Sequence, residues 1–174
     1  MKYLMVLFFS VVTLNCKPKQ AAIIDDLQDV LTTNCPDDGT CTFEVLKNKS
    51  LNILKTDLEE TYTDITDGQS HILKFEYRRN EIANTVDGQY IEQVFIELNP
   101  NNLEVELKDS EFKKAKVMFA RLCYCKGQTG FYEISQGNLL IKKVANKTYR
   151  LVLDFKQDEV PQIITAINEE FSLK

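Results

Sequence analysis

The residues of this sequence that are best suited to chemistry are two pairs of cysteines. Cys35 and Cys41 flank a turn-rich loop, and Cys123 and Cys125 are separated by Tyr124 alone. Structural zinc sites usually space their paired cysteines about two to four residues apart, which neither pair matches. Thiol–disulfide exchange proteins use C-x-x-C and need an exposed thiolate of lowered pKa. We therefore expect structural disulfides and no metal, with a redox role for the C-x-C pair as the alternative.

Two arrangements of these disulfides are compatible with the sequence. A local arrangement joins Cys35 to Cys41 and Cys123 to Cys125. If Cys123 and Cys125 both lie on one extended strand, their Cα atoms are near the upper limit of about 6.8 Å for an unstrained bridge. A crossed arrangement staples the segment 35–41 to that strand through two bridges and avoids this distance. The sequence leaves both arrangements open.

The other groups that could catalyse a reaction form no recognisable motif. His71 is the only histidine, so a catalytic triad or a common zinc site would have to use it. Its neighbour Ser70 points to the opposite face if both lie on a strand, so we expect a half-buried sheet residue. The acids at 37–38, 64 and 67 are interpreted as turn formers, because their spacing does not match a calcium-binding loop. We predict no catalytic residue and no cofactor, which favours a protein that is not an enzyme.

Aromatic residues near the C-x-C pair form a candidate binding surface. Tyr124, Phe131 and Tyr132 lie close to Gly127 and Gly130, so aromatic side chains are combined with turn-forming residues. Such a combination can line a groove or a partner surface. The competing interpretation is that these side chains belong to the core, where aromatic residues on strands usually lie.

The elements that must position these residues are short strands. Apolar and polar residues alternate at 71–77, 90–98 and 149–155, and weaker runs lie at 103–107, 117–125, 131–134 and 139–141. Asp87–Gly88 suits a hairpin turn between the first two runs. Residues 160–173 fit either a helix or a strand, and we expect a strand that pairs with 147–155. The predicted fold class is all-β, an antiparallel β-sandwich or barrel-like meander preceded by one short helix at 21–31.

Composition excludes one large class of partner. The chain of 174 residues has a net charge of −5, and its acidic and basic residues are interspersed. Proteins that bind nucleic acid neutralise phosphates with clustered Lys and Arg, so we predict no nucleic-acid partner.

The N-terminus has the features of an export signal. An apolar run at 3–14 follows Lys2 and is succeeded by Cys16, Lys17 and Pro18. The run is too short to span a bilayer as a helix, which takes roughly 20 apolar residues, but it has the length of the apolar part of a signal peptide. Residues 1–16 therefore resemble the lipobox of bacterial lipoproteins, in which the cysteine is acylated and begins the mature chain. Cleavage to a secreted protein without a lipid is the alternative.

This resemblance implies an exported protein that a lipid on Cys16 anchors to a membrane of the bacterial cell envelope. The domain organisation is then a signal peptide at 1–15, a tether and amphipathic helix at 16–34, and a single β domain at 35–174. We expect a non-enzymatic binding or structural role, with a protein, a glycan or a small apolar molecule as the ligand. The alternative function is thiol–disulfide exchange at the C-x-C pair.

Overall fold

The computed structural model describes residues 35–81 and 83–173. The predicted signal peptide, Cys16 and the helix expected at 21–31 lie outside the described residues. The elements are β1 (Gly39–Lys55), β2 (Thr61–Arg79), β3 (Tyr90–Leu98), β4 (Val105–Lys108), the short 3₁₀ helix η1 (Asp109–Ala115), β5 (Met118–Cys123), β6 (Gly130–Glu133), β7 (Gln136–Ala145), β8 (Thr148–Lys156) and β9 (Ala166–Ser172). Within the described ranges, no helix is long and apolar enough to span a membrane.

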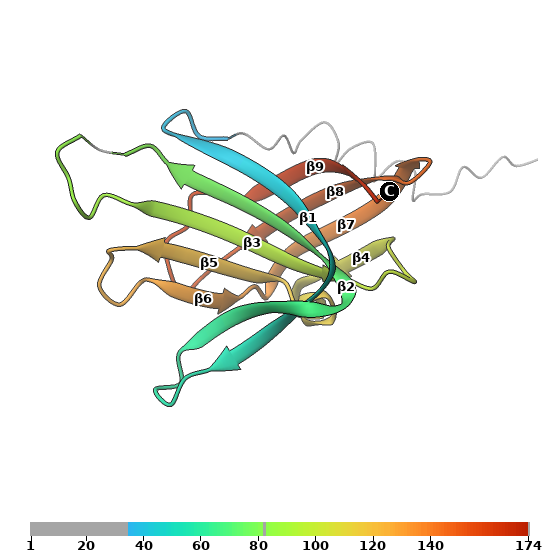
Figure 1. The fold of residues 1–174 in the computed structure, drawn as a ribbon, viewed down its shortest axis with the longest axis horizontal. Helices are drawn as coiled ribbons and strands as arrows, with labels where there is room; N and C mark the ends of the chain where they lie inside the picture. Colours follow the sequence, from blue (N-terminus) through green and yellow to red (C-terminus); the bar gives the residue numbers. More distant parts are fainter. Residues whose placement is uncertain (1–34, 82, 174) are drawn as a thin grey trace, which may run out of the picture.

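The strands form two antiparallel sheets that pack face to face (Figure 1). One sheet has five strands in the order β1-β2-β3-β5-β6, and the other has four in the order β4-β7-β8-β9. The main core lies between them and contains aromatic and branched side chains from both sheets, including Leu73, Phe75, Val94, Phe119, Leu139, Leu153 and Phe155. The predicted all-β fold is confirmed, and it is a sandwich rather than a barrel-like meander.

The C-terminal strand is also confirmed. β9 pairs with β8 in antiparallel register, as expected for a strand that closes against 147–155. Glu169, which interrupts the alternation of apolar residues, lies inside β9 opposite Leu151. Its carboxyl therefore points toward the interior from the edge of the four-stranded sheet, between Ile167 and Phe171. An inward-pointing charge on an edge strand discourages pairing with another chain.

The first hairpin is longer than the sequence pattern suggested, and it bends. β1 and β2 pair along their whole length except for a bulge, where Asn48 of β1, with a φ of 55°, lies against residues 68–70 of β2. Beyond the bulge, residues 49–67 form what we call the arm. The arm doubles back beneath β6 across the outer face of the five-stranded sheet (Figure 1). The prediction that Asp64 and Asp67 lie in turns is wrong, because both are in β2 within this arm.

The arm covers a second apolar cluster on that outer face. Its residues Leu51, Ile53 and Ile65 pack over Ile72, Phe95, Met118 and Ala120, whose side chains point away from the main core. A polar contact holds the arm at its base. The Leu51 N–H donates to Glu97 Oε2 (2.6 Å), and Lys116 Nζ donates to Leu51 O (2.8 Å) while it lies 3.0 Å from Glu97 Oε1. Both faces of the five-stranded sheet are therefore buried along part of its length.

The connection between β2 and β3 differs from the predicted tight turn. The strands pair as a hairpin, but ten residues separate Arg79 from Tyr90, and Asp87–Gly88 is only part of that loop. Among its described residues, the backbone with positive φ is Asn84, at 63°. The hairpin pairing predicted from the alternation is correct, and the two-residue turn is wrong.

Candidate binding surface at the disulfide end

Three loops converge at one end of the sandwich because of the strand register. Gly39 pairs with Arg79, and Tyr90 pairs with Cys123, so the segments 35–38, 83–89 and 124–129 all leave the five-stranded sheet at the same end. We call these three segments the disulfide end. Figure 1 shows the β2–β3 and β5–β6 connections projecting side by side from this end.

Both disulfides lie at the disulfide end, in the local arrangement. Cys35 is bonded to Cys41, with a Cα–Cα distance of 5.7 Å, and Cys123 is bonded to Cys125, with a Cα–Cα distance of 5.2 Å. The expectation that the second distance would approach 6.8 Å is wrong, because β5 ends at Cys123 and the chain turns before Cys125. The segment 124–129 is thus tied to the end of β5.

A buried carboxylate lies under these loops. Glu92 of β3 is 1 % exposed and accepts three hydrogen bonds. Tyr90 Oη donates to its Oε1 (2.6 Å), as does the Ile163 N–H (2.7 Å), and the Ile164 N–H donates to its Oε2 (2.8 Å). Glu92 therefore joins the five-stranded sheet to the β8–β9 connection of the other sheet. A buried carboxylate is tolerated when its oxygens are hydrogen-bonded in this way.

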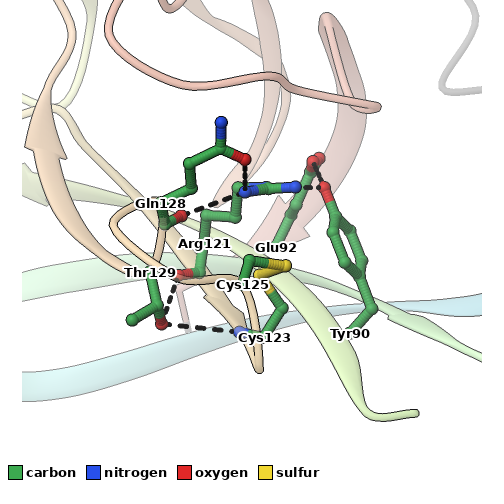
Figure 2. The surroundings of a disulfide bond; sticks show 7 residues. All are labelled: Tyr90, Glu92, Arg121, Cys123, Cys125, Gln128 and Thr129. Atoms are coloured by element: carbon green, nitrogen blue, oxygen red, sulfur yellow. Dashed lines mark hydrogen bonds between the residues drawn. A yellow bond between two sulfur atoms is a disulfide. The ribbon is translucent and has the colours of Figure 1, made fainter.

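Arg121 carries the same network to the loop that contains the C-x-C pair. It is 8 % exposed, and it lies opposite Glu92 on the neighbouring strand β5. Its Nε donates to Tyr90 Oη (3.2 Å), and its Nη1 donates to the carbonyl oxygen (3.1 Å) and to Oε1 (3.0 Å) of Gln128. Thr129 Oγ1 adds a bond to the Arg121 carbonyl oxygen (3.1 Å). Figure 2 shows these bonds beside the Cys123–Cys125 disulfide.

Tyr90 lies at the centre of the network. The guanidinium carbons of Arg79 and Arg121 lie over its ring, at 4.5 Å and 5.2 Å from the centroid. Burial, followed by the hydrogen bond to Glu92, raises the pKa of Tyr90 to about 12. The phenol therefore remains a donor to Glu92 at any physiological pH.

The segment 35–38 is attached in a similar way. Asp38 Oδ1 accepts a hydrogen bond from Tyr77 Oη (2.7 Å), and Asp38 Oδ2 lies 3.2 Å from Arg79 Nε. That ion pair does not have hydrogen-bond geometry, so Arg79 Nε is the one buried side-chain nitrogen or oxygen without a hydrogen-bond partner among the described residues. Burial, followed by the Asp38 contact, raises the pKa of Tyr77. Two of the three segments of the disulfide end, 35–38 and 124–129, are thus held by contacts from the strands below them.

The outer side of the disulfide end is exposed and partly apolar. Val86 is 99 % exposed at the tip of the β2–β3 connection, and Tyr124 is 85 % exposed between the two bonded cysteines. A shallow pocket of about 300 Å³ lies beside Val86 and includes Arg78 and Arg79 in its lining. Exposed aromatic and apolar side chains on rigid loops beside arginine are typical of recognition surfaces.

The three aromatic residues predicted to share a surface are not brought together. Tyr124 is exposed at the disulfide end, whereas Phe131 packs in the outer-face cluster and Tyr132 packs against the main core. Neighbouring residues of β6 point to opposite faces, which separates the last two. His71 is a half-buried residue of β2, as expected, and its Nδ1 accepts a hydrogen bond from the Asn48 N–H (3.4 Å).

Glu92 and Arg121 were missed from the sequence, although a signal was present. Glu92 lies in the same alternating register as Tyr90, Val94 and Ile96, and this register faces the core. A charged residue at an inward position predicts a buried polar network, because an unpaired buried charge is too costly.

The site has few features of a catalytic centre. The two oxygens of Glu92 already accept three protein hydrogen bonds, and the Arg121 guanidinium is committed to Tyr90 and Gln128. Within residues 35–81 and 83–173, no group of three or more His, Cys, Asp or Glu side chains could hold a metal ion. The arrangement orders loops rather than offering a reactive group.

Comparisons with known proteins add no relative. Neither the family models, nor the curated proteins, nor the solved structures contain a match to this chain.

Proposed function

We propose that this is an exported protein, held to a membrane of the cell envelope by a lipid on Cys16, whose β-sandwich is a non-enzymatic binding module. Its binding surface is the disulfide end. The observation that carries this proposal is how firmly the segment 124–129 is held: the Cys123–Cys125 disulfide and the Glu92–Tyr90–Arg121 network brace it, and Tyr124 is exposed on it. The Cys35–Cys41 disulfide closes the neighbouring segment 35–38, and Val86 is exposed on the third segment, 83–89.

Bracing of this kind suits binding rather than folding alone. Loops that are already ordered lose little conformational entropy when a partner binds, so more of the contact energy appears as affinity. A network that served stability alone would not require Tyr124 and Val86 to be almost fully exposed on the loops above it. Exposed aromatic residues on rigid loops are the usual anchors of protein recognition.

The lining of the surface favours a polar partner. Arg78 and Arg79 border the shallow pocket beside Val86, together with Glu81, Thr85 and Gln89. Both guanidinium groups already lie beside a carboxylate of the chain, Arg78 Nη2 at 2.8 Å from Glu76 and Arg79 Nε at 3.2 Å from Asp38. Their remaining N–H donors and the polar rim suit hydrogen-bond acceptors on a partner, so we favour a protein or a glycan over a small apolar molecule.

Export and anchoring are supported by two independent features. The disulfides are typical of proteins that fold in an oxidising compartment, and the N-terminal residues have the order of a signal peptide followed by a lipidated cysteine. The direct test is Cys16→Ser in the full-length chain. The mature-length form should disappear from the membrane fraction, and the variant should accumulate either as uncleaved precursor or as a soluble protein. Retention of mature-length variant in the membrane fraction would exclude the anchor.

The binding surface is tested with a photocrosslinking amino acid in place of Tyr124 in the full-length chain in its own cells, and with a glycan array probed by the purified protein. Val144, which is 45 % exposed on β7, is the control position. Adducts should form from position 124 and not from 144, or array binding should fall about tenfold or more in Tyr124→Ala. The surface is rejected if position 124 gives no adduct beyond those of position 144 and Tyr124→Ala binds the glycan array as well as the wild-type protein does.

Thiol–disulfide exchange is a second candidate function. It is favoured by the position of the Cys123–Cys125 bridge, whose residues are half-buried at a loop beside an exposed tyrosine. Free thiols are titrated on the native protein before and after a mild reductant. Two thiols that open and reclose while the fold is kept would support exchange. A bridge that resists mild reductant, or whose opening unfolds the domain, supports a structural role.

A further inference from the structure

The turn of the arm exposes apolar side chains that do not belong to the disulfide end. Leu58 is 81 % exposed in the turn, and Leu54 and Tyr62 are about two-fifths exposed just before and after it. Leu54 and Tyr62 are cross-strand partners, so their side chains lie on the same face of the arm. This face is opposite to the one that packs on the outer-face cluster through Ile53. The three exposed residues form what we call the arm tip.

The arm tip is held in a fixed position rather than loosely. The base of the arm is fixed by the contacts of Leu51 with Glu97 and Lys116. The turn is closed by backbone bonds between Thr56 and Glu60, and Thr56 Oγ1 accepts hydrogen bonds from the Leu58 N–H (3.3 Å) and the Glu60 N–H (3.2 Å). The arm is therefore a rigid projection, visible below the sandwich in Figure 1.

Acidic residues surround the arm tip. Asp57, Glu60 and Asp64 are exposed and form no ion pair within the described ranges, while Glu59 pairs with Lys55 (3.3 Å). Apolar side chains of this size on a rigid projection serve no packing purpose inside the domain. Apolar side chains surrounded by acidic residues are complementary to an apolar pocket surrounded by basic residues.

We propose that the arm tip is a second interaction surface, which inserts Leu58 into an apolar pocket of a protein partner whose rim carries Lys or Arg. Charge complementarity at the rim would steer association and fix the orientation, while the buried leucine would supply the anchor. This surface is separate from the disulfide end and does not depend on it.

The charges argue against the two other occupants. The anionic surface of a bilayer repels carboxylates and attracts basic segments, so the acidic rim opposes insertion into a membrane. A second copy of the chain has a net charge of −5. Its lysine-bordered pocket under the arm, about 220 Å³ in volume, also contains Glu133, which offsets Lys113.

The test places the photocrosslinker p-benzoylphenylalanine at position 58 of the full-length chain in its own cells. Position 144 is the control for a distant exposed apolar residue. A matched chain carries the crosslinker at 58 together with Asp57→Asn, Glu60→Gln and Asp64→Asn. We expect one discrete protein adduct from 58, none of the same mass from 144, and at least about tenfold less adduct from the neutralised chain.

The adduct partner, identified by mass spectrometry and purified, is then titrated with the wild-type chain and with Leu58→Ser. Binding should weaken at least about tenfold in Leu58→Ser and should weaken as salt is raised. Because Leu58 is 81 % exposed, the variant should unfold at the wild-type urea midpoint, which separates lost binding from lost folding.

Several results would overturn the proposal. These are the absence of any adduct, an adduct with lipid, an adduct with a second copy, and an adduct that is insensitive to the three neutralising substitutions. Adducts from position 124 report on the disulfide end, so failure of one surface is distinguishable from failure of the other.

Discussion

Replacing Glu92 with glutamine tests the brace under the disulfide end. Glu92 Oε1 accepts from Tyr90 Oη and the Ile163 N–H, and Oε2 accepts from the Ile164 N–H. A glutamine oxygen in the Oε1 position can keep the first two bonds. Its amide nitrogen then faces the Ile164 N–H, so two donors oppose each other.

The expected loss follows from these contacts. An unsatisfied buried N–H costs about 1–3 kcal/mol, and the two remaining bonds lose the extra strength that a charged acceptor gives. We expect Glu92→Gln to lower the free energy of unfolding by about 2–4 kcal/mol. Because domains of this size are stable by about 5–15 kcal/mol, the variant should still fold.

Equilibrium unfolding in urea measures this loss in a form that begins at Lys17. With a slope of about 2 kcal/mol per molar, the midpoint should fall by roughly 1–2 M at unchanged slope. The control is Glu106→Gln, whose carboxylate is on the exposed face of β4, 3.8 Å from Lys142. Surface pairs of this kind contribute about 0–1 kcal/mol, so its midpoint should hardly move. A Glu92→Gln midpoint that coincides with the control would refute the brace.

Three further predictions concern stability. Serine replacement of both cysteines should cost roughly 2.4 kcal/mol for the Cys35–Cys41 bridge and roughly 1.6 kcal/mol for Cys123–Cys125, because sequence separations of 6 and 2 close loops of 7 and 3 residues; urea midpoints in the reverse order would contradict this. Burial raises the pKa of Glu169 above 4.5, so its ionised form destabilises the fold at neutral pH, and this cost disappears as pH falls below the ordinary pKa. Glu169→Gln should therefore raise the urea midpoint at neutral pH but not below about pH 4, and an equal shift at both would be inconsistent with titration. Gly137→Ala should cost more than about 2 kcal/mol, because Gly137 has a φ of 136° and a Cβ there would meet Asp154 O at 2.0 Å; Gly127→Ala, with a φ of 69° and open space, should cost only about 1 kcal/mol in thermal unfolding.

The strands that bury one face could be predicted from alternation. Apart from Glu92, β3 and β8 present apolar residues at every second position to the main core, and the pattern at 90–98 and 149–155 identified both. The strand at 166–172 could also be predicted, because its inward residues Ile167 and Phe171 keep the same period on either side of Glu169.

The arm could not be recognised in this way. Asn48 and Gly68 flank the arm, and Asp64 and Asp67 lie within it; all four are ordinary turn formers. What makes the arm a strand pair is its packing on Phe95 and Met118, which lie far away in sequence. Local propensity was therefore overridden by tertiary contact.

The candidate site was only partly predictable for a similar reason. The even number of cysteines after Cys16 predicted that all four are disulfide-bonded. The choice between the two arrangements depended on where β5 ends. The inward position of Glu92 was present in the alternation, whereas two of its donors, Ile163 and Ile164, lie 71 and 72 residues away. A period of two shows that a side chain faces inward and does not show which donors meet it there.

The measurement that tests the proposed function most directly is the mass of the N-terminal peptide of the protein taken from the membrane fraction of its own cells. The proposal predicts a chain that begins at Cys16, with a mass increment equal to a diacylglyceryl group, alone or with a further acyl chain. An unmodified N-terminus at any other residue, or a chain that keeps residues 1–15, would contradict it.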